Sequence, residues 1–100
     1  MDVDSVFKAV ADGTRRDILG ALAERPLPVH ALAARFAVTR PAISKHLRIL
    51  GEAGLVRASR SGKENIYRLE EEPLREVIDW LSRFWSGRLS TLKQLAERKH

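Results

Sequence analysis

Hydrophobic residues between positions 29 and 50 recur at helical spacing in two short runs. The first run places its apolar side chains at the i, i+3, i+4 and i+7 positions of one helix face: Val29, Leu32, Ala33 and Phe36. The second run has its apolar side chains on a single stripe: Ile43, Leu47 and Leu50. A turn of about three residues separates the two runs. This pattern predicts a helix-turn-helix over residues 29–53.

The outer side of the second helix is polar and basic. It carries the side chains opposite the apolar stripe: Pro41, Ser44, Lys45 and Arg48. Thr39 is expected to cap this helix by accepting a hydrogen bond from the N–H of Ala42. A proline is tolerated in the first turn, where backbone N–H groups have no partner within the helix. The helix therefore has one side for the core and the other for DNA.

Two runs of strand character follow the helix-turn-helix, residues 55–60 and 64–69, on either side of Ser61-Gly62-Lys63. Such a pair predicts a β-hairpin. After a recognition helix, this hairpin over 55–69 is a wing, and its basic residues are in position to reach phosphates or the minor groove: Arg57, Arg60, Lys63 and Arg68.

The N-terminal part of the chain predicts two more helices. The first covers Asp4 to Ala11, within a segment 3–12, and its apolar side consists of Val3, Val6, Phe7 and Val10. Gly13 is expected to close this helix in a left-handed conformation. Thr14 to Asp17 fits a capping box that opens the second helix. The second helix turns three apolar side chains toward the core: Ile18, Leu19 and Leu22.

The last predicted helix covers residues 73–97, after an acidic start at Glu70 to Glu72. Its apolar stripe is roughly 140° wide. A helix of about 24 residues is roughly 36 Å long, about the diameter of the whole domain. A single subunit cannot cover such a stripe, so it predicts a dimer through 3–12 and 73–97. The alternative is a core helix lying on its own domain.

The residues expected in the dimer interface are Val3, Val6, Phe7, Val10, Leu74, Val77, Ile78, Leu81, Phe84, Trp85, Arg88, Leu89 and Leu92. Arg88 falls inside the apolar stripe, so it either emerges at a gap or pairs with an acid across the interface. Gly87 allows either a close approach of a second backbone or a local bend. The aromatic residues Trp80, Phe84 and Trp85 are interpreted as packing rather than as a ligand pocket.

The chain of 100 residues is 44% apolar, which fits one domain over 1–100. It contains no apolar run of roughly 18 residues and no basic-then-apolar leader, so a cytoplasmic protein without a membrane segment is expected. The absence of cysteine excludes disulfides and thiolate metal sites.

The net charge of +5 is concentrated in one segment of the chain. Thr39 to Leu69 contains seven basic residues against Glu52 and Glu64, a balance of +5, whereas the remainder has 11 basic and 11 acidic residues. Concentrated positive charge is typical of a nucleic-acid binder. The residues expected to contact DNA are Thr39, Arg40, Pro41, Ser44, Lys45, His46, Arg48, Arg57, Arg60, Lys63 and Arg68.

With this order of elements, the segments Ala11-Asp12-Gly13-Thr14-Arg15-Arg16-Asp17-Ile18-Leu19 and Ser44-Lys45-His46-Leu47-Arg48-Ile49-Leu50 resemble the ArsR/SmtB family of transcriptional repressors. The fold implied is mainly α, a winged helix-turn-helix of about five helices with a small β-hairpin wing and a long C-terminal helix for dimerisation. The resemblance also implies a homodimer that binds a palindromic operator in double-stranded DNA and represses by occupying the promoter.

Metal sensing is not expected, although many members of that family use it. Their Cys-x-Cys sensor pair is replaced here by Pro28 and His30. The last helix has Asp79 but no histidine apart from the terminal His100, so a site of two histidines and two carboxylates cannot be assembled there. No metal or cofactor is therefore predicted, and the sequence leaves the question of an effector ligand open.

Two other classes of function remain for comparison. A winged-helix module that binds an acidic protein partner is the alternative to a DNA-binding regulator. An enzyme has little support, since Ser44 and His46 are near neighbours on a helix that do not face each other. His46 is expected to pack beside the buried stripe or to contact a phosphate, and His30 to lie on the surface.

Overall fold

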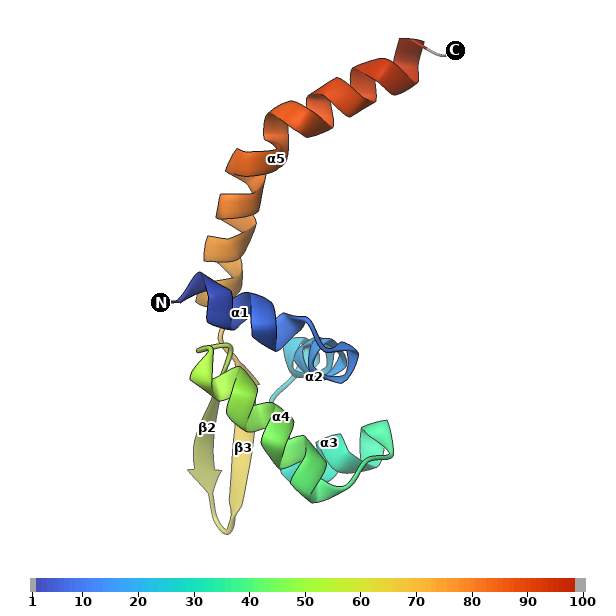
Figure 1. Cartoon of the computed structure of the whole chain (residues 1–100). Helices are drawn as coiled ribbons and strands as arrows, with labels where there is room; N and C mark the ends of the chain where they lie inside the picture. The colour runs from blue at the N-terminus through green and yellow to red at the C-terminus, as the bar shows by residue number, and fades with distance from the viewer. Residues whose placement is uncertain (1, 99–100) are drawn as a thin grey trace.

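The computed structural model describes the backbone of residues 2–98 and the side chains of residues 2–83 and 94–97. Five helices and three strands follow one another along this part of the chain (Figure 1). They are α1 (Val3–Val10), α2 (Gly13–Glu24), β1 (Leu27–Pro28), α3 (Val29–Phe36), α4 (Arg40–Glu52), β2 (Val56–Ser61), β3 (Glu64–Leu69) and α5 (Glu72–Arg98). The architecture is a mainly helical winged helix-turn-helix, which confirms the predicted fold.

The core lies where α1 and α2 meet the helix pair α3 and α4. The stripe predicted for α4 is buried, with Ile43 and Leu50 at 0% exposure and Leu47 at 1%. The other large side chains that are fully buried are Val6, Ile18 and Leu32 on the other helices and Leu55 in the turn between α4 and β2. Burial of large aliphatic side chains stabilises the domain by about 1.5–3 kcal/mol each. These contacts fix the orientation of α4, and hence which side of it faces solvent.

The start of α2 differs from the sequence prediction. Gly13 is the first residue of α2, and it lacks the left-handed backbone expected of a residue closing α1. Asp12, not Thr14, caps α2, because its Oδ2 accepts a hydrogen bond of 3.0 Å from the N–H of Arg15. An aspartate at this place satisfies a first-turn donor and also interacts favourably with the helix dipole. This capping preference placed the helix start two residues before the predicted one.

A third strand joins the wing, which the sequence had indicated only as a hairpin. The sheet order is β1-β3-β2, and β1 pairs antiparallel with β3 through Leu27 opposite Tyr67 and Pro28 opposite Ile66. A strand of two residues leaves no alternating pattern to detect. Proline is tolerated because β1 lies at the edge of the sheet. The pairing brings the start of α3 beside the wing.

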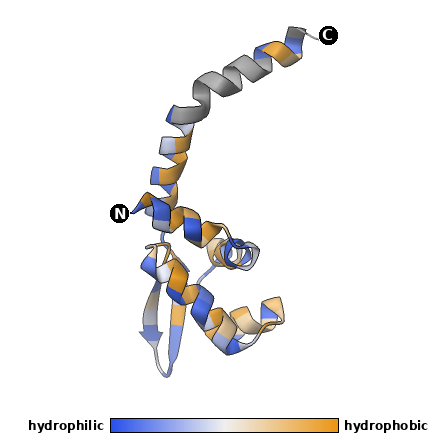
Figure 2. Cartoon of the chain, viewed as in Figure 1, coloured by the Kyte–Doolittle hydropathy of each residue, from blue (hydrophilic) through white to orange (hydrophobic). Residues whose placement is uncertain are grey.

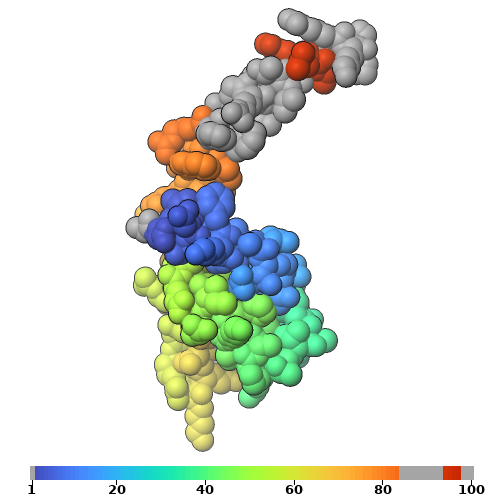
Figure 3. All heavy atoms as spheres, viewed as in Figure 1, coloured from blue at the N-terminus to red at the C-terminus, as the bar shows by residue number. Residues whose placement is uncertain are grey.

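α5 is 27 residues long and runs away from the rest of the domain, as Figures 1 and 3 show. The radius of gyration is 17.2 Å, against about 13 Å expected for a compact chain of 100 residues. Among the described side chains of α5, those that pack against the domain lie in the first turns: Val77 is 8% exposed, and Leu74 and Leu81 are half-buried.

Candidate nucleic-acid interface

The first turn of α4 has the cap that the sequence predicted. Thr39 Oγ1 accepts a hydrogen bond of 3.3 Å from the N–H of Ala42, and Pro41 lies within the first turn. The face opposite the core is exposed, and its residues are Arg40, Pro41, Ser44, Lys45 and Arg48. This face combines a hydroxyl with three cations, and such side chains serve both phosphates and base edges.

The turn between α3 and α4 is three residues long, 37–39. Ala37 ends α3 in the left-handed region, with φ 53°, and its N–H donates to the carbonyl of Ala33. The N–H of Val38 donates to the same carbonyl over 3.3 Å. These two bonds satisfy the end of α3 and set the angle at which α4 leaves the turn.

The basic residues of this surface differ in what they already contact. Arg48 pairs with Glu52 on the same helix at 3.1 Å, and Arg57 pairs with Glu70 at 3.3 Å. The cations without an ion pair among the described residues are Arg40, Lys45, Arg60, Lys63 and Arg68. These five carry charge that only a ligand of opposite sign can neutralise.

Two arginines of the wing lie directly opposite each other. Arg57 on β2 is the cross-strand partner of Arg68 on β3. Like charges at such a position destabilise an antiparallel pair, by a few tenths of a kcal/mol. The ion pair with Glu70 relieves this repulsion at Arg57 alone. Two arginines at this position slightly lower the stability of the free domain. They suit a surface that binds a polyanion.

The turn of the wing is held by one of its own basic side chains. Arg60 Nε donates a hydrogen bond of 3.0 Å to the carbonyl of Gly62, whose φ of 62° places it in the left-handed region that glycine tolerates. Lys63 follows in the turn and is exposed. Figure 3 shows the tip of the wing projecting beyond the body of the domain.

His46, which was grouped with the DNA-contacting residues, faces the interior side of the domain. Its Nδ1 lies 3.4 Å from Arg15 Nη1 and 3.9 Å from Asp12 Oδ2, and its side chain is 22% exposed. The structure thus places His46 against the junction of α1 and α2, as the packing alternative expected. It lies on the flank of α4, between the buried stripe and the exposed face.

Asp12 at this junction is held as a carboxylate. The hydrogen bond from the backbone N–H of Arg15 lowers the pKa of Asp12 below its ordinary value, and the positive charge of the Arg15 side chain adds to the effect. The same arginine donates to the carbonyls of Ala9 and Lys8, over 2.7 and 3.0 Å. The junction therefore joins α1, α2 and α4 through polar contacts.

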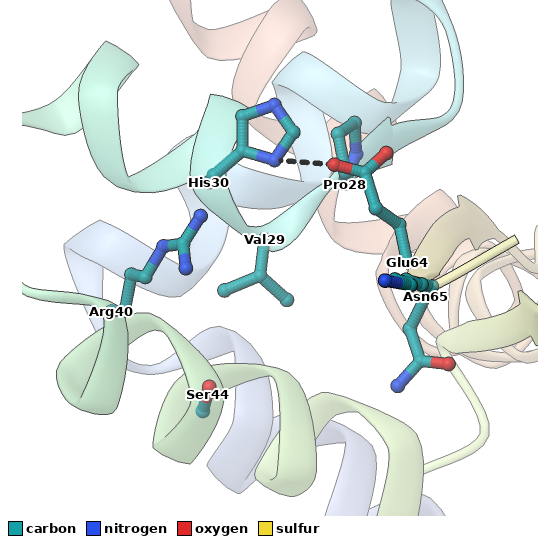
Figure 4. Close-up of a pocket in the computed structure, with 8 residues that line it drawn as sticks. Pro28, Val29, His30, Arg40, Ser44, Glu64 and Asn65 are labelled. Atoms are coloured by element: carbon teal, nitrogen blue, oxygen red, sulfur yellow. Dashed lines mark ion pairs between the residues drawn. The ribbon is translucent and has the colours of Figure 1, made fainter. Parts of the chain in front are cut away.

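A hollow of about 300 Å³ lies between the start of α3, the start of α4 and the wing. Its lining is shown in Figure 4 and consists of Pro28, Val29, His30, Arg40, Ser44, Lys63, Glu64 and Asn65. His30 Nδ1 forms an ion pair of 2.9 Å with Glu64 Oε1 across the hollow. Arg40, Ser44 and Lys63 were predicted from the sequence, whereas the other five were not. No sequence signal indicated them, because these residues come together only when β1 pairs with β3 and brings α3 beside the wing.

A second exposed surface is apolar and lies on α1 and α5. Figure 2 shows hydrophobic residues on α1 and on the first turns of α5. The rings of Phe7 and Trp80 meet edge to face at a centroid distance of 6.0 Å, and both remain exposed, at 37% and 43%. Ile78 is 57% exposed. Trp80 was outside the predicted interface set, because it falls beyond the stripe that periodicity defined.

The other residues predicted for the dimer interface fall into three groups. Val6 and Val77 are buried in the chain's own core, at 0% and 8% exposure, so they support this surface from beneath. The half-buried members are Val3, Val10, Leu74 and Leu81. The side chains of Phe84, Trp85, Arg88, Leu89 and Leu92, as well as Gly87, lie outside the described residues.

Within the part of the chain that the structure describes, no group of three or more His, Asp or Glu side chains is placed to hold a metal ion. Nor does any described helix combine the length and apolar character required to cross a membrane. His30, predicted to lie on the surface, is exposed and contacts Glu64. His100 lies outside the described residues.

Comparison with known proteins agrees with this geometry. Residues 12–58 match the arsR family of bacterial regulatory proteins. The chain is 40% identical over 94 residues to the HTH-type transcriptional regulator Rv2034 of Mycobacterium tuberculosis, covering 94% of this chain and 88% of that protein. It is 35% identical over 82 residues to the transcriptional repressor SdpR of Bacillus subtilis, covering 82% and 91%.

Solved structures show the same fold. An ArsR-like transcriptional regulator from a Rhodococcus species superposes with a TM-score of 0.80 at 38% identity, over 96% of this chain and 91% of that one. The homodimeric winged helix-turn-helix DNA-binding domain of a possible ArsR-family regulator from Mycobacterium bovis gives a TM-score of 0.70 at 30% identity, over 89% and 82%. The chain belongs to the ArsR family of winged helix-turn-helix transcriptional regulators. It is a DNA-binding protein of a non-enzymatic family.

Proposed function

We propose that this chain is a homodimeric repressor that binds a palindromic operator. The observation that carries the proposal is the exposed face of α4, where Ser44 lies with Arg40 and Lys45, two cations that form no ion pair among the described residues. The buried stripe of Ile43 and Leu47 holds that face outward. The face continues into the hollow beside the wing, so the helix and the hairpin form one basic surface.

The α4 face supplies the contacts that read sequence, and the wing supplies affinity. Ser44 and Lys45 lie one turn into the helix, where a helix in the major groove reaches base edges. Lys63 and Arg68 belong to the hairpin, where cations meet the DNA backbone in a sequence-independent way.

Dimerisation is supported by the exposed apolar surface of α1 and α5. Phe7, Ile78 and Trp80 expose large apolar side chains on adjacent elements. A two-fold dimer presents two recognition helices to successive major grooves about 34 Å apart, and such a dimer requires an operator with two-fold symmetry. The relative from Mycobacterium bovis is described as homodimeric, in agreement with this arrangement.

Repression follows from occupancy of the operator. A dimer covering two successive grooves excludes other proteins from the same stretch of DNA, and no second activity is needed. The relative in Bacillus subtilis is named a transcriptional repressor. The proposal implies a cytoplasmic location, because the family is one of bacterial regulatory proteins and bacterial DNA lies in the cytoplasm.

The experiment is a selection of bound duplexes from a random-sequence library, followed by affinity measurement on the selected duplex. We expect a palindrome, bound with a stoichiometry of two chains per duplex. Ser44→Ala with Lys45→Ala should lower the affinity for the selected duplex by roughly tenfold to a hundredfold, as the loss of base and phosphate contacts implies. Arg25→Ala removes one exposed cation from the end of α2 and is the matched control.

Four outcomes would count against the proposal. If no sequence is enriched, the chain does not bind DNA sequence-specifically. If the affinity of the double variant is unchanged, the α4 face is not part of the interface. Binding of acidic peptides with DNA-like affinity would favour the module that binds an acidic protein partner. Near-equal affinity for double-stranded DNA of any sequence would mean that the chain binds DNA only through sequence-independent electrostatic attraction to the phosphates.

A further inference from the structure

The wing carries a single carboxylate, and it lies at the DNA-facing surface. Glu64 is the only acidic residue between Val56 and Leu69, and its side chain lines the hollow together with Lys63 and Arg40. A carboxylate there opposes the phosphates of bound DNA. The other acid of the basic segment, Glu52, is already paired with Arg48 on the same helix.

Glu64 is paired with a residue from outside the basic segment. His30, in the first turn of α3, places Nδ1 at 2.9 Å from Glu64 Oε1. Figure 4 shows the imidazole and the carboxylate pointing toward each other across the hollow, from α3 and from the wing. The contact exists because β1 pairs with β3 immediately before α3 begins.

We propose that His30 is a positioning residue for DNA binding: its imidazole holds the Glu64 carboxylate, so that the hollow between α3, α4 and the wing accepts a DNA phosphate. The inference rests on the proposed function. It assigns a role in DNA binding to a residue that lies outside the basic segment and acts through Glu64, without contacting DNA itself.

The contact between His30 and Glu64 could serve either the stability of the fold or the affinity for DNA, and the small stability contribution of exposed ion pairs decides between the two. The side chains of His30 and Glu64 are 47% and 49% exposed. Pairs at such exposure contribute little to folding, so the contact is a weak tether for the wing. The charge of Glu64 beside a phosphate is a separate effect, which arises only when DNA is bound. His30 therefore acts on affinity and leaves the stability of the domain nearly unchanged.

The test compares four proteins on one labelled duplex, the one that the wild type selects from a random-sequence library. His30→Ala leaves the carboxylate without its partner and should weaken binding roughly fivefold, the effect of a nearby like charge at a hydrated surface. Glu64→Gln should bind at least as tightly as the wild type. The double variant should match Glu64→Gln, because His30 matters only through the carboxylate.

A matched control separates this role from a structural one. Arg35→Ala removes the partner of Glu24, another exposed pair at 3.3 Å, and should leave affinity unchanged. The charged groups that share the hollow with His30 are Glu64 and Lys63 on the wing and Arg40 on α4.

Equal affinity of His30→Ala and the wild type would overturn the inference. A double variant as weak as His30→Ala would also overturn it, because His30 would then contact DNA itself. If the wild type selects no duplex, the proposed function fails and this inference falls with it; if it selects one, each result above bears on His30 alone.

Discussion

The guanidinium of Arg15, near the start of α2, donates a hydrogen bond of 2.7 Å from Nε to the backbone carbonyl of Ala9, near the end of α1. A second bond of 3.0 Å runs from Nη2 to the carbonyl of Lys8. Carbonyls of the last helical turn lack the usual partner within the helix, and Arg15 supplies one to Ala9, while the carbonyl of Lys8 also accepts a bond of 3.3 Å from the N–H of Ala11. Its Nη1 lies 3.4 Å from His46 on α4. One side chain therefore joins an element of the proposed dimer surface to the recognition helix.

Replacing Arg15 with alanine should reduce the free energy of unfolding by about 2 kcal/mol, because two bonds from a charged donor are lost at a half-buried site. Arg16→Ala is the control. Arg16 donates one bond of 2.8 Å to the carbonyl of Val10 from an exposed position, and its loss should reduce stability by about 1 kcal/mol or less. Urea unfolding of both variants gives the comparison. Equal losses of unfolding free energy would mean that Arg15 stabilises the junction no more than Arg16 does.

The salt dependence of DNA binding should depend on Lys63. Each phosphate contact contributes a slope of about 0.9 to the log–log plot of affinity against salt concentration. Lys63→Ala should therefore flatten that slope by about one unit per protomer, without changing base preference. Arg60 is less suited to this measurement, because its side chain also holds the carbonyl of Gly62 in the wing turn. A constant slope with altered base preference would mean that the wing reads sequence directly.

Ile78 should be required for the dimer and dispensable for the fold, because 57% of its side chain is exposed in the single chain. Ile78→Lys would bury an unpaired charge in the proposed interface, and we expect the dimer dissociation constant to rise roughly a hundredfold or more. Ala34→Lys, at an exposed position of α3 away from α1 and α5, is the control. Sedimentation equilibrium measures both. A wild type that is monomeric at micromolar concentration and still binds a palindrome tightly would contradict the dimer.

The left-handed backbone of Ala37 predicts a stabilising substitution. An L-residue in this region costs about 1–2 kcal/mol, whereas glycine adopts it freely. Ala37→Gly should stabilise the domain by about 0.5–1 kcal/mol after the greater entropy of unfolded glycine is subtracted. Ala34→Gly, at an exposed position inside α3, should instead destabilise it by about 1 kcal/mol. Thermal unfolding distinguishes them, and a loss of stability in both would show that φ at Ala37 carries no strain.

Acid should weaken the domain partly through Asp12. Its pKa is lowered by the hydrogen bond from the Arg15 backbone N–H, so the carboxylate stabilises the folded state at any pH above the ordinary value of 3.8. That contribution is lost as the pH falls from about 3.8 through the lower folded pKa. Asp12→Asn keeps a capping oxygen without the titration. The wild type should therefore have the higher urea midpoint at neutral pH, and the two midpoints should converge in acid. A constant difference would contradict the assignment.

Local patterns in the sequence were sufficient for α3, α4 and the β2–β3 hairpin. Val29 to Phe36 forms α3 with the predicted bounds, and Thr39 caps α4 as expected. The turn around Gly62 joins β2 and β3 as the strand runs indicated. These features depend on neighbours in the chain: a helix face repeats every three or four residues, and a cap acts on a donor three residues away. The location of the net charge also required only the order of residues.

What the sequence by itself determined is therefore the set of elements and the side of α4 that faces outward. Only the tertiary structure decided what meets across elements. The contact of His30 with Glu64 spans 34 positions and exists because β1, too short for any periodic signal, pairs with β3. His46 likewise faces Arg15 because the packing of α4 on α1 and α2 sets its rotation. Periodicity counts apolar positions along one element, whereas these contacts depend on how separate elements pack, which no local pattern encodes.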